Sequence, residues 1–101
     1  EGINIAVPEG TSVRAAENGV VIYAGSELEG LGNLVLVRHA DNWVTAYAHN
    51  RSLKVARGDK VTRGQIIATA GQTGKVTSPQ LHFELRKGSK PVDPLRYLSA
   101  L

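Results

Sequence analysis

The side chains best suited to chemistry in this chain are its three histidines, His39, His49 and His82. Catalytic zinc takes three or four nitrogen or carboxylate ligands that converge within about 2.3 Å, and it keeps one position open. Gln80 and His82 stand two residues apart, so on a strand they project from the same face. A glutamine amide, however, is a poor zinc ligand and cannot act as a general base near neutral pH. This pair alone therefore does not predict a metal centre.

Each histidine also has a structural interpretation. A lone histidine on a strand is commonly a hydrogen-bonded structural residue, and we favour that interpretation for His39. For His49 and His82 the structural and the chemical interpretations both stay open, because the sequence does not show that their strands bring them together. The chain has no cysteine, which excludes disulfides, thiolate metal sites and a cysteine nucleophile.

The segments that must position these side chains are typical of short strands separated by glycine turns. Five stretches are rich in valine, isoleucine and leucine or alternate in polarity, and we expect strands over 19–25, 33–39, 43–49, 65–70 and 80–87. The apolar run 34–37 suits a strand that is covered on both faces. In 43–49 the alternation places one set of side chains on one face: Trp43, Thr45, Tyr47 and His49. In 80–87 it separates Leu81, Phe83 and Leu85 from the polar set Gln80, His82, Glu84 and Arg86.

This pattern predicts an all-β sandwich or barrel, followed by one helical turn within 93–101, where Pro94 suits a first helical position. With 101 residues, 42% of them hydrophobic and 21% charged, we expect a single globular domain over 1–101. No apolar run approaches the roughly 20 residues of a membrane span. The chain begins at Glu1 and contains no methionine, so we expect a domain excised from a longer protein.

Charge is distributed unevenly along the chain. The net charge is −4 over residues 1–50 and +7 over residues 51–101. Five bases in the second half recur at a spacing of three: Arg51, Lys54, Arg57, Lys60 and Arg63. They indicate either attraction to an anionic partner, such as cell wall or nucleic acid, or a solvated rim that prevents strand-edge pairing. We favour the rim, because side chains at that spacing alternate faces in an extended chain.

The chain also contains an internal echo. A Val-x-x-Gly-x-x-Val pattern at 7–13 recurs at 55–61, and each copy is followed by a glycine, an apolar pair and Ala-Gly. We call these the first echo segment (7–25) and the second echo segment (55–71). Two copies about 48 residues apart are too few for a solenoid, so they indicate two related β-units packed against each other.

A series of short motifs keeps its order and spacing along essentially the whole chain: Gly2-Ile3-Asn4-Ile5, Pro8-x-Gly10-Thr11-x-Val13-x-Ala15, Gly19-Val20-Val21, Gly30-x-Gly32-Asn33, Thr45-x-Tyr47-Ala48-His49, Gly58-Asp59-x-Val61-x-x-Gly64-Gln65, Gly71-x-Thr73-Gly74, Leu81-His82-Phe83-Glu84 and Asp93-Pro94. This series resembles the LytM (lysostaphin-type) peptidoglycan endopeptidase domain. The resemblance implies an antiparallel β-sandwich of the duplicated hybrid-motif type, with an open groove across one sheet.

Carried over by position, the resemblance implies an incomplete zinc site. Active members bind zinc through a His-x-x-x-Asp motif and the second histidine of His-x-His, and two further histidines serve the attacking water. Asn4 stands where the zinc-binding aspartate belongs, and Gln80 stands where the first histidine of His-x-His belongs. His82 and His49 keep a ligand and a catalytic position, while the remaining ligand position falls one residue before Glu1. We therefore expect no metal, no cofactor and no peptidase activity.

Degenerate LytM domains of the EnvC, NlpD and DipM type activate cell-wall hydrolases during division. The resemblance thus implies a periplasmic protein without catalysis, whose groove binds an amidase-type hydrolase and, as a second candidate, peptidoglycan itself. It implies neither a nucleic-acid partner nor a membrane span. The expected contact residues are Asn4, Tyr47, His49, Gln80 and His82.

Three alternatives remain open at this point: a metallopeptidase with altered ligands, a peptidoglycan-binding module, and a carrier domain. Residues 55–71 resemble the hairpin pattern of biotinyl and lipoyl carriers. That resemblance covers a fraction of the chain, and Lys75 lacks the flanking residues of a modified lysine.

Overall fold

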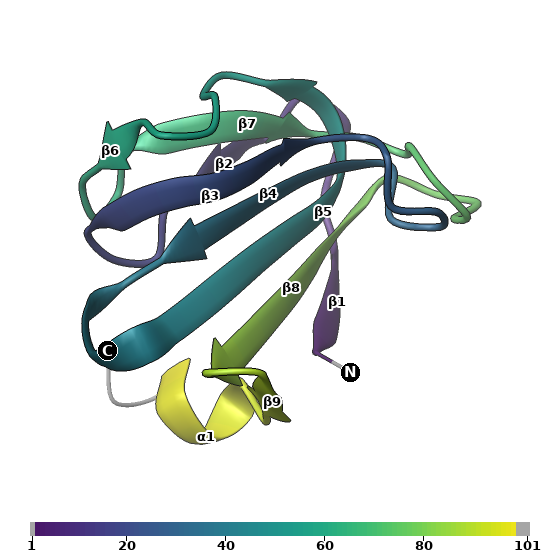
Figure 1. Cartoon of the computed structure of the whole chain (residues 1–101). Helices are drawn as coiled ribbons and strands as arrows, with labels where there is room; N and C mark the ends of the chain where they lie inside the picture. Colours follow the sequence, from purple (N-terminus) through teal and green to yellow (C-terminus); the bar gives the residue numbers. More distant parts are fainter. Residues whose placement is uncertain (1, 99–101) are drawn as a thin grey trace.

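The computed structural model describes residues 2–98, which form nine β-strands, a short 3₁₀ segment and a final helical turn (Figure 1). The elements are β1 (Ile3–Ala6), β2 (Ser12–Arg14), β3 (Gly19–Gly25), β4 (Asn33–Arg38), η1 (Ala40–Asn42), β5 (Trp43–Leu53), β6 (Lys60–Val61), β7 (Ile66–Ala70), β8 (Gln80–Lys87), β9 (Lys90–Val92) and α1 (Leu95–Leu98). No helix among these residues is long and apolar enough to cross a membrane.

All strand pairings within residues 2–98 are antiparallel, as the resemblance to the LytM domain implies. The main path of the sheet runs β1-β8-β5-β4-β3-β6, and β7 links β2 to the far end of β5. The 11-residue β5 is long enough to pair with β4 and β8 first and with β7 afterwards. Register shifts near its Asn50 accompany this change of partner, because a bulge bends a strand and increases its twist.

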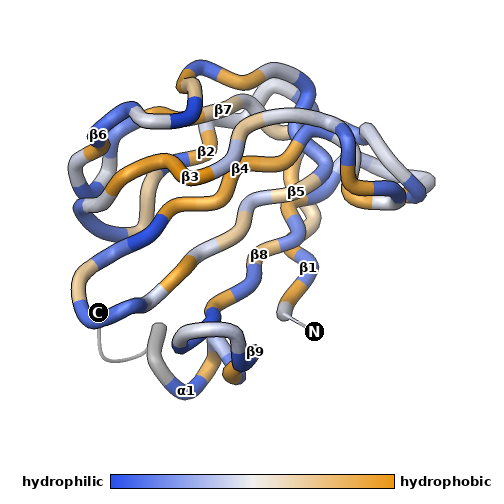
Figure 2. The backbone as a smooth tube through the Cα atoms, in the orientation of Figure 1, coloured by the Kyte–Doolittle hydropathy of each residue, from blue (hydrophilic) through white to orange (hydrophobic). Residues whose placement is uncertain are grey.

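The bend in β5 folds the sheet over itself and encloses the core. Buried side chains of β2 and β7, such as Val13 and Ile67, pack with those of β3, β4, β5 and β8, such as Val35, Tyr47 and Phe83. Figure 2 shows the apolar character concentrated along the central strands β3 and β4. The expected all-β sandwich is therefore confirmed.

Most expected elements are found, with different ends. Residues 80–87 form β8 as predicted, whereas β5 continues four residues beyond the expected end at His49. The expected helical turn is α1, and the remainder of that prediction, 99–101, lies outside the described residues. The sequence did not indicate β1, β2, β6 or β9, because strands of two to four residues show no readable alternation.

The two echo segments pair with each other reciprocally. In the first, β2 pairs with β7 of the second, and β6 of the second pairs with β3 of the first. Their glycine turns make matching contacts, because Gly10 donates its N–H to Ala70 O and Gly58 donates its N–H to Val21 O, each at 2.8 Å. The two related units are therefore joined by exchanged strand pairing as well as by packing.

A chain of hydrogen bonds crosses the core from the β2 side to β4. The Ala16 N–H donates to Tyr47 Oη at 2.9 Å, and Tyr47 Oη and Thr45 Oγ1 lie 2.7 Å apart. His39 bonds to Thr45 Oγ1 through Nε2 and to the Asn18 carbonyl through Nδ1, both at 2.7 Å. A carbonyl only accepts, so His39 carries its proton on Nδ1. The structural role expected for His39 is confirmed.

Candidate functional site

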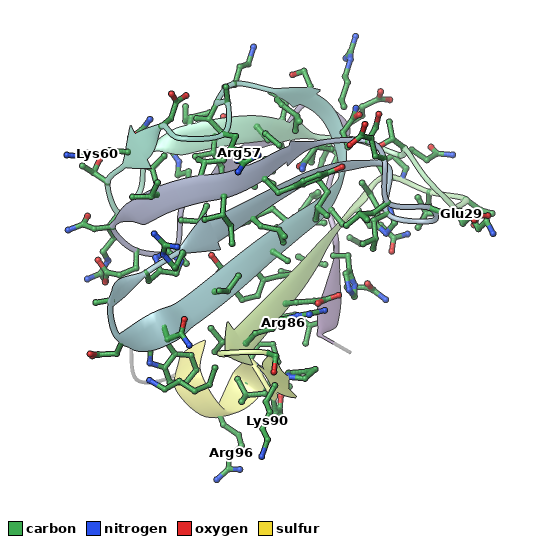
Figure 3. All side chains as sticks on the ribbon, viewed as in Figure 1. Glu29, Arg57, Lys60, Arg86, Lys90 and Arg96 are labelled. Atoms are coloured by element: carbon green, nitrogen blue, oxygen red, sulfur yellow. The ribbon has the colours of Figure 1, made fainter. Side chains whose placement is uncertain are left out.

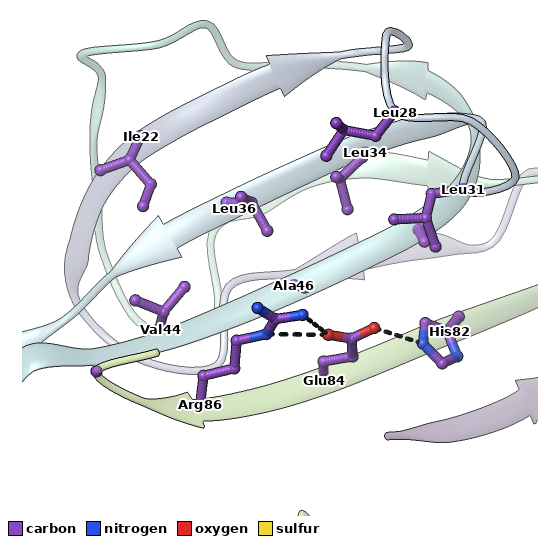
Figure 4. Close-up of a pocket in the computed structure, with 12 residues that line it drawn as sticks. Ile22, Leu28, Leu31, Leu34, Leu36, Val44, Ala46, His82, Glu84 and Arg86 are labelled. Carbon is purple, nitrogen blue, oxygen red and sulfur yellow. Dashed lines mark hydrogen bonds and ion pairs between the residues drawn. The ribbon is translucent and has the colours of Figure 1, made fainter. Parts of the chain in front are cut away.

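The candidate site is an open groove of about 270 Å³ on the face of the central sheet that points away from the core (Figure 4). Its floor and one wall are aliphatic, and its opposite edge is polar. The floor comes from β3, β4 and β5, namely Ile22, Leu34, Leu36, Val44, Ala46 and Ala48. The wall comes from the loop between β3 and β4 through Leu28 and Leu31, and the polar edge comes from β8 through His82, Glu84 and Arg86.

The apolar floor follows from the continuous apolar run in β4. Val35 and Val37 face the core and are fully buried, so Leu34 and Leu36 must face the groove. Leu31 packs on the groove face of β4 and covers only part of it. Leu36 on this face is half-buried, and Leu28 in the adjoining loop is 46% exposed. The expectation that β4 is covered on both faces is thus met only in part, and the uncovered part is the groove.

At the polar edge, β1 and β8 pair so that Asn4 lies opposite His82. Asn4 Oδ1 is 2.6 Å from His82 Nδ1. On the other side of the ring, His82 Nε2–H donates to Glu84 Oε2 at 2.8 Å. Both ring nitrogens of His82 are therefore engaged by side chains of the protein.

Glu84 is the central acceptor of this edge. Its Oε1 accepts bonds from Arg86 Nε at 3.2 Å and Nη2 at 2.9 Å, while its Oε2 faces His82. Partial burial raises the pKa of Glu84, but the hydrogen bonds from His82 and Arg86 and their positive charge outweigh it, so the pKa lies below its ordinary value. Glu84 is accordingly an ionised carboxylate at neutral pH.

His49 lies on the groove side, next to His82, with 6.0 Å between the ring centroids. The alternation of 43–49 placed His49 on the same face as Tyr47, whereas the structure puts Tyr47 in the core and His49 beside His82, so the expectation of a shared face is wrong. His49 has a φ of +68°, a left-handed conformation that interrupts the alternation and turns its side chain. Its Nδ1–H donates to the Thr73 carbonyl at 2.8 Å, and the side chain is nearly buried.

Tyr47 does not line the groove. Its side chain is 1% exposed and belongs to the core, where its hydroxyl joins the hydrogen-bond chain to Thr45. Burial raises its pKa above the ordinary value of 10.0, although its hydrogen bonds act in the opposite direction. The expectation that Tyr47 belongs to a contact surface is corrected, because the side chain points to the opposite face of β5.

Gln80 is half-buried at the start of β8, and its Nε2 donates to the Ser78 carbonyl at 3.2 Å. Its main chain bridges to Gly71. It does not line the apolar groove. Of the five expected contact residues, the structure brings Asn4, His49 and His82 together, places Gln80 near them and puts Tyr47 elsewhere.

Two loops, 26–32 and 71–79, are locked together at the end of the groove. Thr73 Oγ1 accepts from the Asn33 N–H at 3.1 Å and donates to the Asn50 carbonyl at 2.6 Å. The Lys75 N–H donates to Gly30 O, and His49 binds both loops, its N–H to Leu31 O and its ring to Thr73 O. His49 therefore links the two loops through hydrogen bonds.

The residues present do not fit a catalytic zinc ion. Asn4 offers a neutral amide oxygen, and this oxygen is already in direct contact with His82 Nδ1. Glu84, the carboxylate that β8 contributes to this edge, is already hydrogen-bonded to His82 and Arg86. Within residues 2–98, no group of three or more histidine, cysteine, aspartate or glutamate side chains could hold a metal ion.

Comparison with known proteins assigns the chain to a family. The model of peptidase family M23 matches residues 1–94. The chain belongs to peptidase family M23. Solved structures of the family superpose closely. Full-length lysostaphin from Staphylococcus simulans gives a TM-score of 0.94 at 33% identity, covering 98% of this chain and 43% of that one. The LytM resemblance and its implied fold are thus confirmed.

Relatives of this chain include a cell division protein and a murein hydrolase activator. "Cell division protein DipM" of Caulobacter vibrioides is 48% identical over 100 residues, covering 93% of this chain and 16% of that protein. "Murein hydrolase activator NlpD" of Escherichia coli strain K12 is 47% identical over 98 residues, covering 97% of this chain and 26% of that protein. The chain therefore spans well under half the length of these relatives, and other relatives carry the name lipoprotein.

Glu84, Arg86 and the apolar floor were not among the residues singled out from the sequence. The signals that could have found them are present. The alternation of 80–87 places Glu84 and Arg86 on the face of His82, and the apolar run of β4 indicates a second apolar face.

Proposed function

We propose that this chain is a non-catalytic M23 domain that binds and activates a peptidoglycan hydrolase of the amidase type through its groove, in the periplasm. One observation carries the proposal. The groove of a peptidase fold has an aliphatic floor and wall, while Asn4 and His82, which stand at two ligand positions of the family, are in direct contact with each other. The names of the relatives, murein hydrolase activator and lipoprotein, support this assignment of function and of location.

Hydrolysis of a peptide by this fold would require a Lewis acid and an activated water. Replacing an aspartate by Asn4 removes a negative charge that helps to hold a divalent cation. Replacing a histidine by Gln80 removes a base, since an amide does not titrate. The domain is therefore proposed to act by binding alone.

The chemistry of the floor limits what can bind there. The strands beneath the groove, β3, β4, β5 and β8, are hydrogen-bonded to one another, so the floor offers no free backbone groups. An extended peptide would gain no strand pairing there. A segment that satisfies its own backbone, such as an amphipathic helix, can instead place apolar side chains against Leu36 and Val44 without that loss. Asn4, His49, Gln80 and His82 are proposed as the polar contacts at the end of the groove.

Activation would follow from a shift in population. If the amidase alternates between a closed and an open form, a domain that binds the open form more tightly raises its population. The domain then needs no catalytic group of its own. It needs a surface whose affinity differs between the two forms.

The test combines metal analysis with a peptidoglycan dye-release assay, using the chain alone, single purified amidases and their mixtures. We expect zinc-free protein that releases no dye alone and raises amidase turnover. The variant Leu36→Ser should lose the activation. The matched control Ile66→Ser changes another part-exposed aliphatic residue, on β7 outside the groove, and should keep the activation. Zinc at one equivalent with hydrolysis by the chain alone would refute the proposal.

A second candidate function is binding of peptidoglycan itself, favoured by the basic second half of the chain. Two of the five spaced bases, Arg51 and Arg63, approach Glu9 and Glu17 at 3.8 and 4.0 Å in exposed positions, where such pairs contribute little. Arg57 lies in the loop before β6 and Lys60 lies on β6, and both side chains are exposed (Figure 3). Sedimentation with purified sacculi distinguishes this function, because Arg57→Gln with Lys60→Gln should abolish co-sedimentation and leave amidase activation intact.

A further inference from the structure

The polar edge of the groove holds a guanidinium group whose donors are only partly used. Arg86 directs Nε and one Nη2 N–H to Glu84 Oε1, which leaves three of its five N–H donors without a partner among the residues that the structure describes. The side chain is 43% exposed. In Figure 4 the guanidinium lies along the groove, between Glu84 and the floor residues Val44 and Leu36.

Glu84 holds this guanidinium in a defined orientation. The carboxylate is 12% exposed and takes bonds from Arg86 on one oxygen and from His82 on the other. A planar guanidinium that is already oriented loses less conformational freedom when it forms further hydrogen bonds. The Glu84–Arg86 pair is therefore suited to present the remaining donors to a ligand.

The surroundings favour an anion as that ligand. Among the residues that line the groove, Glu84 is the one acid, and both of its oxygens are engaged by the protein. The aliphatic floor excludes water when it is covered, which strengthens any charged hydrogen bond formed at its edge. An apolar segment without a negative group would instead cover the free Arg86 donors and leave them unsatisfied, which is costly.

We propose that Arg86 is a specificity residue that binds an acidic side chain at the edge of the apolar face of the hydrolase segment in the groove, with Glu84 as its positioning residue. This inference rests on the proposed function and adds the chemistry of the partner. The segment carries aliphatic side chains for the floor and a carboxylate for Arg86. The eight aliphatic lining residues favour such a protein segment over a glycan, whose hydroxyl groups would find no partners on the floor.

The test measures the affinity of the chain for each peptidoglycan amidase of the source bacterium, immobilised singly. We expect Arg86→Gln to weaken binding roughly ten- to a hundred-fold, as the loss of a charged hydrogen bond does. Arg86→Lys keeps the charge without the planar fork and should recover part of the loss. Lys90→Gln is the matched control, because Lys90 is an exposed base on β9 outside the groove (Figure 3). Circular dichroism melting of each variant verifies that the fold is intact.

Leu36→Ser separates the failure of this inference from the failure of the proposed function. If Leu36→Ser weakens binding and Arg86→Gln does not, the segment docks in the groove but its carboxylate does not bind Arg86, and the inference is overturned. If neither variant weakens binding, or no amidase binds, the proposed function fails and the inference with it. If Arg86→Gln leaves amidase binding unchanged but reduces co-sedimentation with sacculi, the carboxylate belongs to a peptidoglycan stem peptide, and the inference is overturned in favour of that ligand.

Discussion

Replacing Gly74 by alanine would test whether the two loops at the end of the groove act as one unit. Gly74 has a φ of +85°, and a Cβ built on it would lie 2.6 Å from both Gly30 O and Gly32 N. These atoms belong to the backbone of the facing loop, so they cannot move aside as the end of a flexible side chain can. The loops would have to separate.

The size of the effect can be worked out with a matched glycine. Gly58 also has a positive φ, +97°, but a Cβ there would meet nothing within 4 Å. Gly58→Ala should therefore cost only the left-handed penalty, about 1–2 kcal/mol. Gly74→Ala should cost that penalty plus the strain of overpacking, about 1–3 kcal/mol more. The summed loss for Gly74→Ala, about 2–5 kcal/mol, does not exceed the stability of small domains, which is about 5–15 kcal/mol.

Urea unfolding, followed by the fluorescence of the single tryptophan, measures both free energies of unfolding. The same proteins should differ in amidase binding, because Leu28 and Leu31 of the wall belong to the loop that Gly74 contacts. We expect Gly74→Ala to bind more weakly and Gly58→Ala to bind normally. Equal free energies of unfolding for the two variants, within about 0.5 kcal/mol, would refute the reasoning about loop contact.

Three further predictions concern single side chains. Tyr47→Phe should lower the free energy of unfolding by about 1–3 kcal/mol in urea titration, because it leaves Thr45 and a backbone N–H without their buried hydrogen-bond partner. A loss below about 0.5 kcal/mol would contradict a stabilising role of the Tyr47 hydroxyl. His49→Ala should speed amide hydrogen exchange in loops 26–32 and 71–79. His49→Asn should keep most of the protection, because asparagine tolerates a positive φ and can donate to Thr73 O. Equal exchange rates in the two variants would exclude the role of His49 as a link between the loops. The pKa of Glu84 is lower in the folded chain, so the stability that its carboxylate contributes is fully present above pH 4.5, its ordinary pKa, and is lost as the pH falls through the folded pKa. The free energy of unfolding of the wild type minus that of Glu84→Gln should therefore decrease as the pH falls over that range. A difference that does not change with pH would count against this prediction.

The regular strands could be predicted because their side chains alternate over enough residues. The segment 80–87 has eight residues with clear alternation and became β8 as expected, with Phe83 in the core and His82 on the groove. The two-residue β6 has no alternation to read, and it exists only because β3 offers it a partner. Such strands are a consequence of pairing between distant segments.

The residue types of the site could be predicted from the sequence, but their arrangement in space could be predicted only in part. The motifs assigned Asn4 to the position of a zinc-binding aspartate and His82 to a retained ligand position, and the structure places these two side chains in direct contact. The alternation of β5 misplaced His49, since no local pattern reports that its φ is positive. The position of Tyr47 in the family motif led us to expect a surface contact, although its ring is buried in the core.

By itself, the sequence determined the fold class, the family, and the asparagine and glutamine at positions 4 and 80, because these depend on residue identity and on periodicity along the chain. Only the tertiary structure decided that His49 meets His82, that the outward side chains of β4 and β5 form an apolar groove, and that Arg86 is oriented by Glu84 at its edge. Those features depend on which strands pair and in which register, and that choice is made by the burial of the whole core rather than by any one segment.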